Sequence, residues 1–222
     1  MQKPVQSDIY VARDVQLVID LFAPVFEHDW WDEVIIDHLD SMADLTLRAY
    51  NKNVVSALVL LKNHFPFNGY QNFEKELTIN DTREIVAKDY GFASWKDAKT
   101  RGNRKPDTLF ELSVDCLIHG QTEDLIDVLQ SNRTLLSARS AYGHQSNLLG
   151  YVGANGVEIR RQITPLNIVA ITEALLKLGA DPSETIPVYG KECSVKELIE
   201  TSAHPHEAGV AGDLLGLLSR FD

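Results

Sequence analysis

The fold of this chain is indicated most clearly by residues 174–182, Ala-Leu-Leu-Lys-Leu-Gly-Ala-Asp-Pro. In and just before this stretch, apolar side chains recur at intervals of three and four residues, at Ile168, Ile171, Leu175 and Leu178. Such spacing places them on one face of a helix. Gly179 then closes the pattern, because glycine adopts the left-handed conformation of a helix end without strain. The stretch therefore predicts a short amphipathic helix followed by a loop.

The same helical pattern occurs elsewhere in the chain, whereas runs that alternate apolar and polar residues are absent. Its other clear examples are Val54, Leu58, Leu61 and Phe65, and later Leu214, Leu217, Leu218 and Phe221. Helix starts are indicated by a short polar residue three positions before a glutamate, as in Asp81–Glu84, Thr108–Glu111 and Ser194–Glu197. Thr122 is a further candidate for a helix N-cap, and Gly91 and Gly120 for helix ends. These signals predict an all-α protein.

A polar segment at residues 101–107, which contains glycine and proline, marks the best boundary. We therefore expect an N-terminal helical region at 1–104 and a second region at 105–222. The second region consists of units of roughly 40 residues with a shared plan of helix, turn, helix and loop. The first unit has helices at 108–118 and 122–130.

The second and third units are less regular. The second has an inner helix within residues 147–156, an insertion at 157–164, and an outer helix with Pro165 at its first position. The third follows Ser194, turns at His204-Pro205-His206 and closes at Phe221.

Residues 174–182 resemble the end of an ankyrin repeat, whose outer helix closes on Leu-Leu-x-x-Gly-Ala-Asp. The inner helix of that family opens with Thr-Pro-Leu-His-x-Ala, but here Leu148 stands for the proline and Gly150 for the histidine. The chain also resembles a bacterial subgroup of ankyrin-repeat proteins of uncharacterised function. That likeness rests on residues 141–144, 154–158, 179–181, 189–190 and 201–205, and on Gly-Phe-Ala-Ser-Trp at 91–95. It covers about residues 80–218.

This resemblance implies an α-solenoid of about three irregular ankyrin-like helix pairs, preceded by the N-terminal helical region. It also implies a non-enzymatic scaffold that binds a protein or peptide through inter-repeat loops and inner helices. In two loops, 137–146 and 183–192, we expect the binding residues to be Arg139, Tyr142, His144, Gln145, Tyr189 and Lys191. Loops carried on a rigid framework are a common place for binding residues.

Composition excludes several classes of partner. The net charge of −11 argues against nucleic acid, which is bound by clustered lysine and arginine. A short basic stretch at 96–105 is explained by a helix end, or by attraction to the acidic residues of 27–44. No apolar run is long enough to span a membrane, and the N-terminus lacks the features of a secretory signal. We therefore expect a cytoplasmic protein.

Motifs for catalysis, cofactors and metals are missing from the sequence. No Gly-x-Ser-x-Gly elbow or phosphate-binding loop is present. His28 with Asp32, and His204 with His206, lack a third ligand nearby. Cys116 and Cys193 give no metal spacing and are interpreted as buried residues of helices. We predict no catalytic residue, no metal and no cofactor.

Two alternatives stay open. The first is a small-molecule sensor or hydrolase-like enzyme with a histidine–carboxylate site in a cleft between the N-terminal helices and the repeats. A pocket that gathers several of His28, His64, His119 and His144 with carboxylates would favour it. The second is a homodimer through the C-terminal helix. Of the adjacent Trp30 and Trp31, one is expected in the core and the other half exposed.

Overall fold

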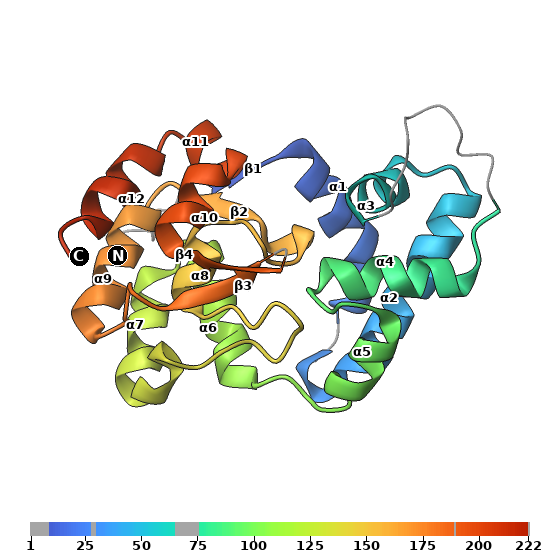
Figure 1. The fold of residues 1–222 in the computed structure, drawn as a ribbon, viewed down its shortest axis with the longest axis horizontal. Helices are drawn as coiled ribbons and strands as arrows, with labels where there is room; N and C mark the ends of the chain where they lie inside the picture. The colour runs from blue at the N-terminus through green and yellow to red at the C-terminus, as the bar shows by residue number, and fades with distance from the viewer. Residues whose placement is uncertain (1–8, 28–29, 65–75, 189, 222) are drawn as a thin grey trace, which may run out of the picture.

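A computed structural model describes residues 9–27, 30–64, 76–188 and 190–221 of the chain. Within these ranges the protein is mostly helical, as the sequence predicted, with strands confined to two short antiparallel pairs (Figure 1). No helix in the described part of the chain is both long enough and apolar enough to cross a lipid bilayer. His28 and Tyr189, which the sequence singled out, lie outside the described residues.

The N-terminal half contains one short strand, five α-helices and two 3-10 helices among its described residues. In chain order these are β1 (Ile9–Val11), α1 (Arg13–Phe22), η1 (Ala23–Val25), η2 (Trp30–Asp32), α2 (Ile35–Asn51), α3 (Val55–His64), α4 (Ile79–Asp89) and α5 (Trp95–Arg101). The long helix α2 packs on α3 and α4, and α1 packs on α3. Trp30 is buried and Trp31 half-buried, as predicted.

The C-terminal half holds the remaining elements. They are α6 (Thr108–Ile118), α7 (Thr122–Ser131), η3 (Arg133–Leu136), α8 (Leu148–Val152), η4 (Ile159–Arg161), β2 (Ile163–Pro165), α9 (Ile168–Leu178), β3 (Thr185–Val188), β4 (Lys191–Ser194), α10 (Val195–Thr201), α11 (Ala203–Glu207) and α12 (Ala211–Leu218). The helices contact each other in pairs, α6 with α7, α8 with α9, and α10 with α12. Successive pairs also touch, because α8 contacts both α6 and α10, and α9 contacts both α7 and α12.

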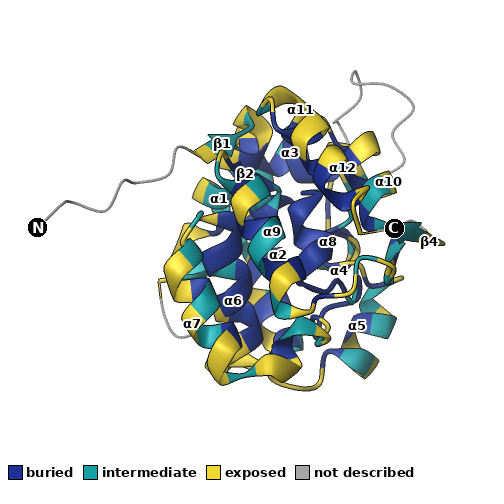
Figure 2. Cartoon of the chain, turned by 90° about the vertical axis from the view of Figure 1, so that its left-hand side faces the viewer, coloured by how far each residue is buried: buried dark blue, intermediate teal, exposed yellow. Residues whose placement is uncertain are grey.

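Most of these helices bury one side against their neighbours and leave the other to solvent, as Figure 2 shows for α7, α9 and α12, whereas the short helix α8 is buried throughout. In α9 the buried side contains Ile168, Ile171 and Leu175, three of the four residues that defined the predicted stripe. Gly179 ends the helix with φ of 106°, as expected for a glycine in this place. In α12 the predicted face is buried at Leu214, Leu217 and Leu218.

The basic stretch after α5 lies against the start of α2. Backbone N–H groups of Ile35 and Ile36 donate to the carbonyls of Arg104 (2.9 Å) and Gly102 (3.0 Å). Lys105 Nζ lies 3.4 Å from Asp32 Oδ1. Among the described residues, the attraction between the basic and acidic stretches is realised in one exposed ion pair, beside backbone hydrogen bonds that do not depend on charge.

The outer helix of the second unit begins later than predicted. Thr164 and Pro165 lie in β2, which pairs with β1 through Tyr10↔Thr164 and Ile9↔Pro165, and α9 starts only at Ile168. The prediction that Pro165 is the first residue of that helix was wrong. Its physical cause is the strand β1, which supplies a backbone partner from the far end of the chain and leaves no local signal.

Several predicted helix starts also differ. The Ser194–Glu197 capping box is confirmed. Helix α4 instead starts three residues early, with Thr78 and Asp81 forming the box. The N-cap of α6 is Asp107, whose carboxylate accepts the N–H groups of Leu109 and Phe110. Because neighbouring short polar side chains can accept hydrogen bonds from the same N–H groups, the sequence pattern alone did not identify the residue that caps the helix.

Three smaller predictions also need correction. The N-cap of α7 is Gln121, not Thr122, and its side chain makes no capping hydrogen bond. His204, Pro205 and His206 belong to the one-turn helix α11 instead of forming a turn. Cys193 lies half-buried in strand β4, whereas Cys116 is a buried helical residue as predicted.

Candidate functional site

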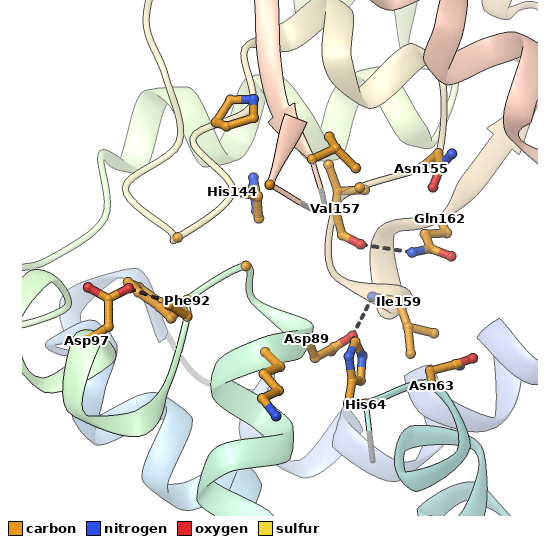
Figure 3. Close-up of a pocket in the computed structure, with 18 of the residues that line it drawn as sticks. Asn63, His64, Asp89, Phe92, Asp97, His144, Asn155, Val157, Ile159 and Gln162 are labelled. Atoms are coloured by element: carbon orange, nitrogen blue, oxygen red, sulfur yellow. Dashed lines mark hydrogen bonds and ion pairs between the residues drawn. The ribbon is translucent and has the colours of Figure 1, made fainter. Parts of the chain in front are cut away.

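A cleft of about 610 Å³ lies between the N-terminal helices and the loops of the C-terminal half (Figure 3). One wall comes from the ends of α3 and α4, the turn after α4, and α5. The other comes from three parts of the C-terminal half: Gly143 and His144, the segment at 155–162, and the residues Pro187, Val188 and Gly190. Both walls mix polar and apolar groups. Its volume falls within the range of roughly 300–1,000 Å³ that is usual for ligand sites.

The back of the cleft is held by a close contact between two glycines. The N–H of Gly143 donates to the carbonyl of Tyr90 at 2.9 Å. A Cβ atom on Gly143 would lie 2.2 Å from the carbonyl carbon of Gly91, which is closer than two non-bonded heavy atoms can approach. Gly91 itself has φ of 76°, a value that other residues rarely adopt. The turn after α4 and the loop at 141–144 therefore fit together only as glycines.

Arg101 strengthens this junction from α5. Its guanidinium donates to Asp97 Oδ2 at 3.1 Å and to the carbonyl of Gly143 at 3.2 Å, and it lies 5.4 Å from the ring centre of Phe92. Asp97 also accepts the N–H of Ala93 at 3.1 Å. The Gly-Phe-Ala-Ser-Trp segment at 91–95 is thus a rigid wall of the cleft.

A histidine–carboxylate pair lies at the same wall, where α3 and α4 end. His64, the last residue of α3, places Nε2 at 3.0 Å from Asp89 Oδ1 at the end of α4. The same carboxylate oxygen accepts the N–H of Ile159 at 3.2 Å. Asp89 is buried, with 1% of its side chain exposed, whereas His64 keeps 17% exposed. Asp89 therefore links α3, α4 and η4 at the edge of the cleft.

His144 also lines the cleft, but both of its ring nitrogens are occupied. Nε2 lies 3.0 Å from Glu158 Oε2, and Nδ1 accepts the N–H of Ser146 at 3.1 Å. Since Nδ1 accepts, the ring proton is on Nε2 and points at Glu158. His144 thus stabilises its loop and offers no free nitrogen to a ligand.

Behind His144, a cluster of charges is buried around Arg161. Its guanidinium pairs with Glu111, with Glu158 at 3.2 Å and with Asp115 at 2.8 Å. Arg161, Glu111 and Glu158 have side chains with 0% exposure. Buried charges persist only when they are paired in this way.

The environment drives the pKa values of the two buried glutamates apart. Burial raises the pKa of Glu111, and its contact with Arg161 does not fully offset that effect. Burial acts on Glu158 in the same direction, but the hydrogen bond from His144 and the charge of Arg161 outweigh it and lower its pKa to about 2. Glu158 is therefore the firmly ionised partner of Arg161.

Three buried tyrosines surround this cluster. Tyr90 and Tyr142 pack edge to face with ring centres 4.7 Å apart, and Tyr151 meets His144 at 5.8 Å. Burial raises the pKa of all three hydroxyls well above the ordinary value. These rings connect the end of α4 to the loop at 141–144 and to α8, and they belong to the core.

The structure describes five of the six residues predicted to bind a partner, and their environments differ. Tyr142 and His144 are buried, at 1% and 2% exposure, and their side chains present almost no surface to a partner. Arg139 binds within its own half, donating to Glu184 (3.1 Å) and to the carbonyls of Thr185 and Gln145. Lys191 is exposed on β4. Tyr189 lies outside the described residues.

Local sequence reasoning overlooked most of the buried residues that shape the cleft. Glu158 and Arg161 fall in the segment predicted to be an insertion, and Glu111 was interpreted as half of a capping box. Asp89 was not singled out. His64 had been named as one member of a convergent pocket, and it does line the cleft together with His144, Asp89 and Asp97. His119 does not line it.

Groups of three or more potential metal ligands do not occur among the described residues. No family model, curated protein or solved structure matches the chain.

Proposed function

We propose that the protein is a non-enzymatic binding protein built on three ankyrin-like helix pairs, and that it holds a peptide segment of a partner in the cleft. The contacts between successive helix pairs support the repeat assignment, because stacked repeats touch only their neighbours. Extended segments join the pairs, including the β3–β4 hairpin after Gly179.

The N-terminal helices limit where a partner binds. In an open array the inter-repeat loops and inner helices would form one exposed surface. Here the loop at 141–144 is fixed against the turn after α4 by the Gly91–Gly143 contact and by Arg101. Beside this junction a cleft stays open on the loop side, and this is the observation that carries the proposal.

The walls of the cleft suit a short peptide. Val157, Ile159 and Val188 line the cleft with apolar side chains, while Asn63 and Lys88 line it with polar ones. Backbone hydrogen bonds fix the walls in advance, which lowers the entropic cost of binding. Of the basic residues nearby, Arg104 donates to the carbonyl of Ala141 and Lys105 pairs with Asp32. Together with the net charge of −11, these pairings argue against nucleic acid as the ligand.

Photo-crosslinking in the native host tests this function. A benzophenone amino acid at Ala93, an exposed residue of the cleft wall, should yield an adduct with a partner protein. The same substitution at Gln130, an exposed residue of α7 that does not line the cleft, is the matched control and should yield none. The proposal is overturned if Ala93 gives no adduct or if both positions give the same one.

The His64–Asp89 pair favours a second candidate, a small-molecule sensor or hydrolase-like enzyme, because such pairs also serve in proton transfer. A panel of chromogenic esters, phosphoesters and amides distinguishes the two functions. Turnover of one of these compounds by the wild-type protein, abolished in His64→Phe, would support the enzyme. Adducts from Ala93 without turnover would support the peptide-binding protein.

A further inference from the structure

The polar groups of the cleft differ in whether they are already engaged. Both ring nitrogens of His144 have partners, as described above. Gln162 donates from Nε2 to the carbonyl of Val157 at 2.8 Å, and its Oε1 lies 3.3 Å from His204 Nε2. Asp97 is held by Arg101 and by the N–H of Ala93. These hydrogen bonds hold the three side chains in the walls of the cleft.

His64 differs from His144, because only one of its nitrogens is engaged. A carboxylate in its ionised form accepts hydrogen bonds and cannot donate them, so Asp89 requires the proton on Nε2. In the neutral ring Nδ1 then carries a lone pair. Within the described part of the chain, Nδ1 makes no hydrogen bond. The 17% exposure of this side chain and its place in the wall give a ligand access to it (Figure 3).

Asp89 is fixed independently of His64. Its side chain is buried, and the N–H of Ile159 donates to the oxygen that also receives His64 Nε2–H. Figure 3 shows Asp89 between His64 and the segment that carries Ile159. The carboxylate therefore sets both the tautomer and the orientation of the ring, as carboxylates do for histidines in binding sites.

We propose that Nδ1 of His64 is a hydrogen-bond acceptor that the cleft offers to its ligand, with Asp89 as its positioning residue, and that the group bound is an N–H or O–H donor of the peptide. This inference rests on the proposed peptide-binding function. It assigns a polar anchor to a cleft whose other described histidine is already paired.

The experiment begins with a phage-displayed library of random peptides, selected on the full-length wild-type protein. From these peptides we take one that the Ala93→Trp variant, whose cleft is filled by the indole, no longer binds. Its affinity is then measured for the wild-type protein and for His64→Phe. We expect His64→Phe to weaken its binding tenfold or more, because the donor of the peptide is left unpaired. The matched control His206→Phe, at an exposed histidine of α11, should bind within twofold of wild type.

The role of Asp89 is tested without any ligand. Long-range proton–nitrogen correlation spectra of the imidazole rings should show His64 of the wild-type protein as the Nε2–H tautomer. Asp89→Asn retains a carbonyl acceptor and should preserve that tautomer, whereas Asp89→Leu should give a mixture. An Nδ1–H tautomer in the wild-type protein would overturn the inference even if the leucine variant fails to fold.

The failures are distinguishable. If no peptide is selected, or if Ala93→Trp binds every selected peptide as well as wild type does, both the proposed function and the inference are wrong. If peptides bind in the cleft but His64→Phe binds them as well as wild type, only the inference falls.

Discussion

Arg161 brings a positive charge into an interior where Glu111 and Glu158 are fully buried. Removing one partner of such a cluster leaves the others charged and unpaired. We predict that Arg161→Met lowers the free energy of unfolding by about 3–5 kcal/mol. Urea denaturation followed by circular dichroism measures this change.

The matched control is Arg48→Met, which removes an exposed pair with Asp44 on α2. Exposed pairs contribute little, so we expect a change below about 1 kcal/mol. Equal losses in the two variants would show that the buried cluster is not a specific source of stability.

Gly143 gives a second prediction at this scale. In Gly143→Ala the added methyl group would overlap the backbone of Gly91 and Phe92, both within 2.2 Å of the ideal Cβ position. Overpacking of this kind costs about 1–3 kcal/mol or more, so the melting temperature should fall by several degrees. In Gly212→Ala, on an exposed part of α12 with open space around the Cβ, we expect a small increase instead. An unchanged melting temperature in Gly143→Ala would refute the close contact.

Helix α6 shows what local pattern could and could not predict about an element. The sequence predicted its bounds correctly, because its apolar stripe and the glycine after it are local features. It did not predict which polar residue caps the helix. It also could not show that Glu111 pairs with Arg161, since that partner lies 50 positions away.

The cap of α6 gives a prediction of its own. Asp107→Ala removes the acceptor for two N–H groups and should cost about 1 kcal/mol of stability. The neighbouring Thr108→Ala is the control, because Thr108 lies inside the helix and should change stability by no more than about 0.5 kcal/mol. Chemical denaturation of both variants decides the matter. A larger loss in Thr108→Ala would identify Thr108 as the true cap.

His38 connects α2 with η1 and η2. Its ring packs on Phe26 and Trp30, with centres 4.8 Å and 5.4 Å away. The nearest carboxylate oxygen, of Glu33, is 3.6 Å from Nδ1 and too distant for a hydrogen bond. Burial, assisted by the charges of Arg160 and Arg161, lowers the pKa of His38 to about 4.

The sign of the resulting pH dependence follows from this lowered pKa. The unfolded chain binds a proton near pH 6.5, whereas the folded protein does so only near pH 4. The contribution of His38 to the free energy of unfolding is therefore fully present above pH 6.5. It is lost as the pH falls toward 4, which lowers the free energy of unfolding by about 2–3 kcal/mol. His38→Phe should remove that part of the pH dependence in urea denaturation at pH 7 and 4.5. His206→Phe should keep it, and an identical slope in His38→Phe and wild type would contradict this account.

At the scale of the whole molecule, the two halves predicted from the sequence meet through contacts that no local pattern could reveal. Strand β1 pairs with β2, Asp89 binds the backbone of Ile159, and Gly143 lies against Gly91. The segment at 157–164, predicted to be an insertion, supplies a partner in two of these three contacts. Helical periodicity predicted the mostly helical fold, but the cleft depends on pairings between distant residues.

The cleft as the binding site is the central claim, and the affinity of a selected peptide for Ala93→Trp tests it most directly. Isothermal titration calorimetry should show at least a tenfold loss for Ala93→Trp and no loss for Gln130→Trp, with both variants folded as judged by circular dichroism. If Ala93→Trp binds the peptide as tightly as wild type, or if Gln130→Trp loses as much affinity, the cleft is not where the peptide binds.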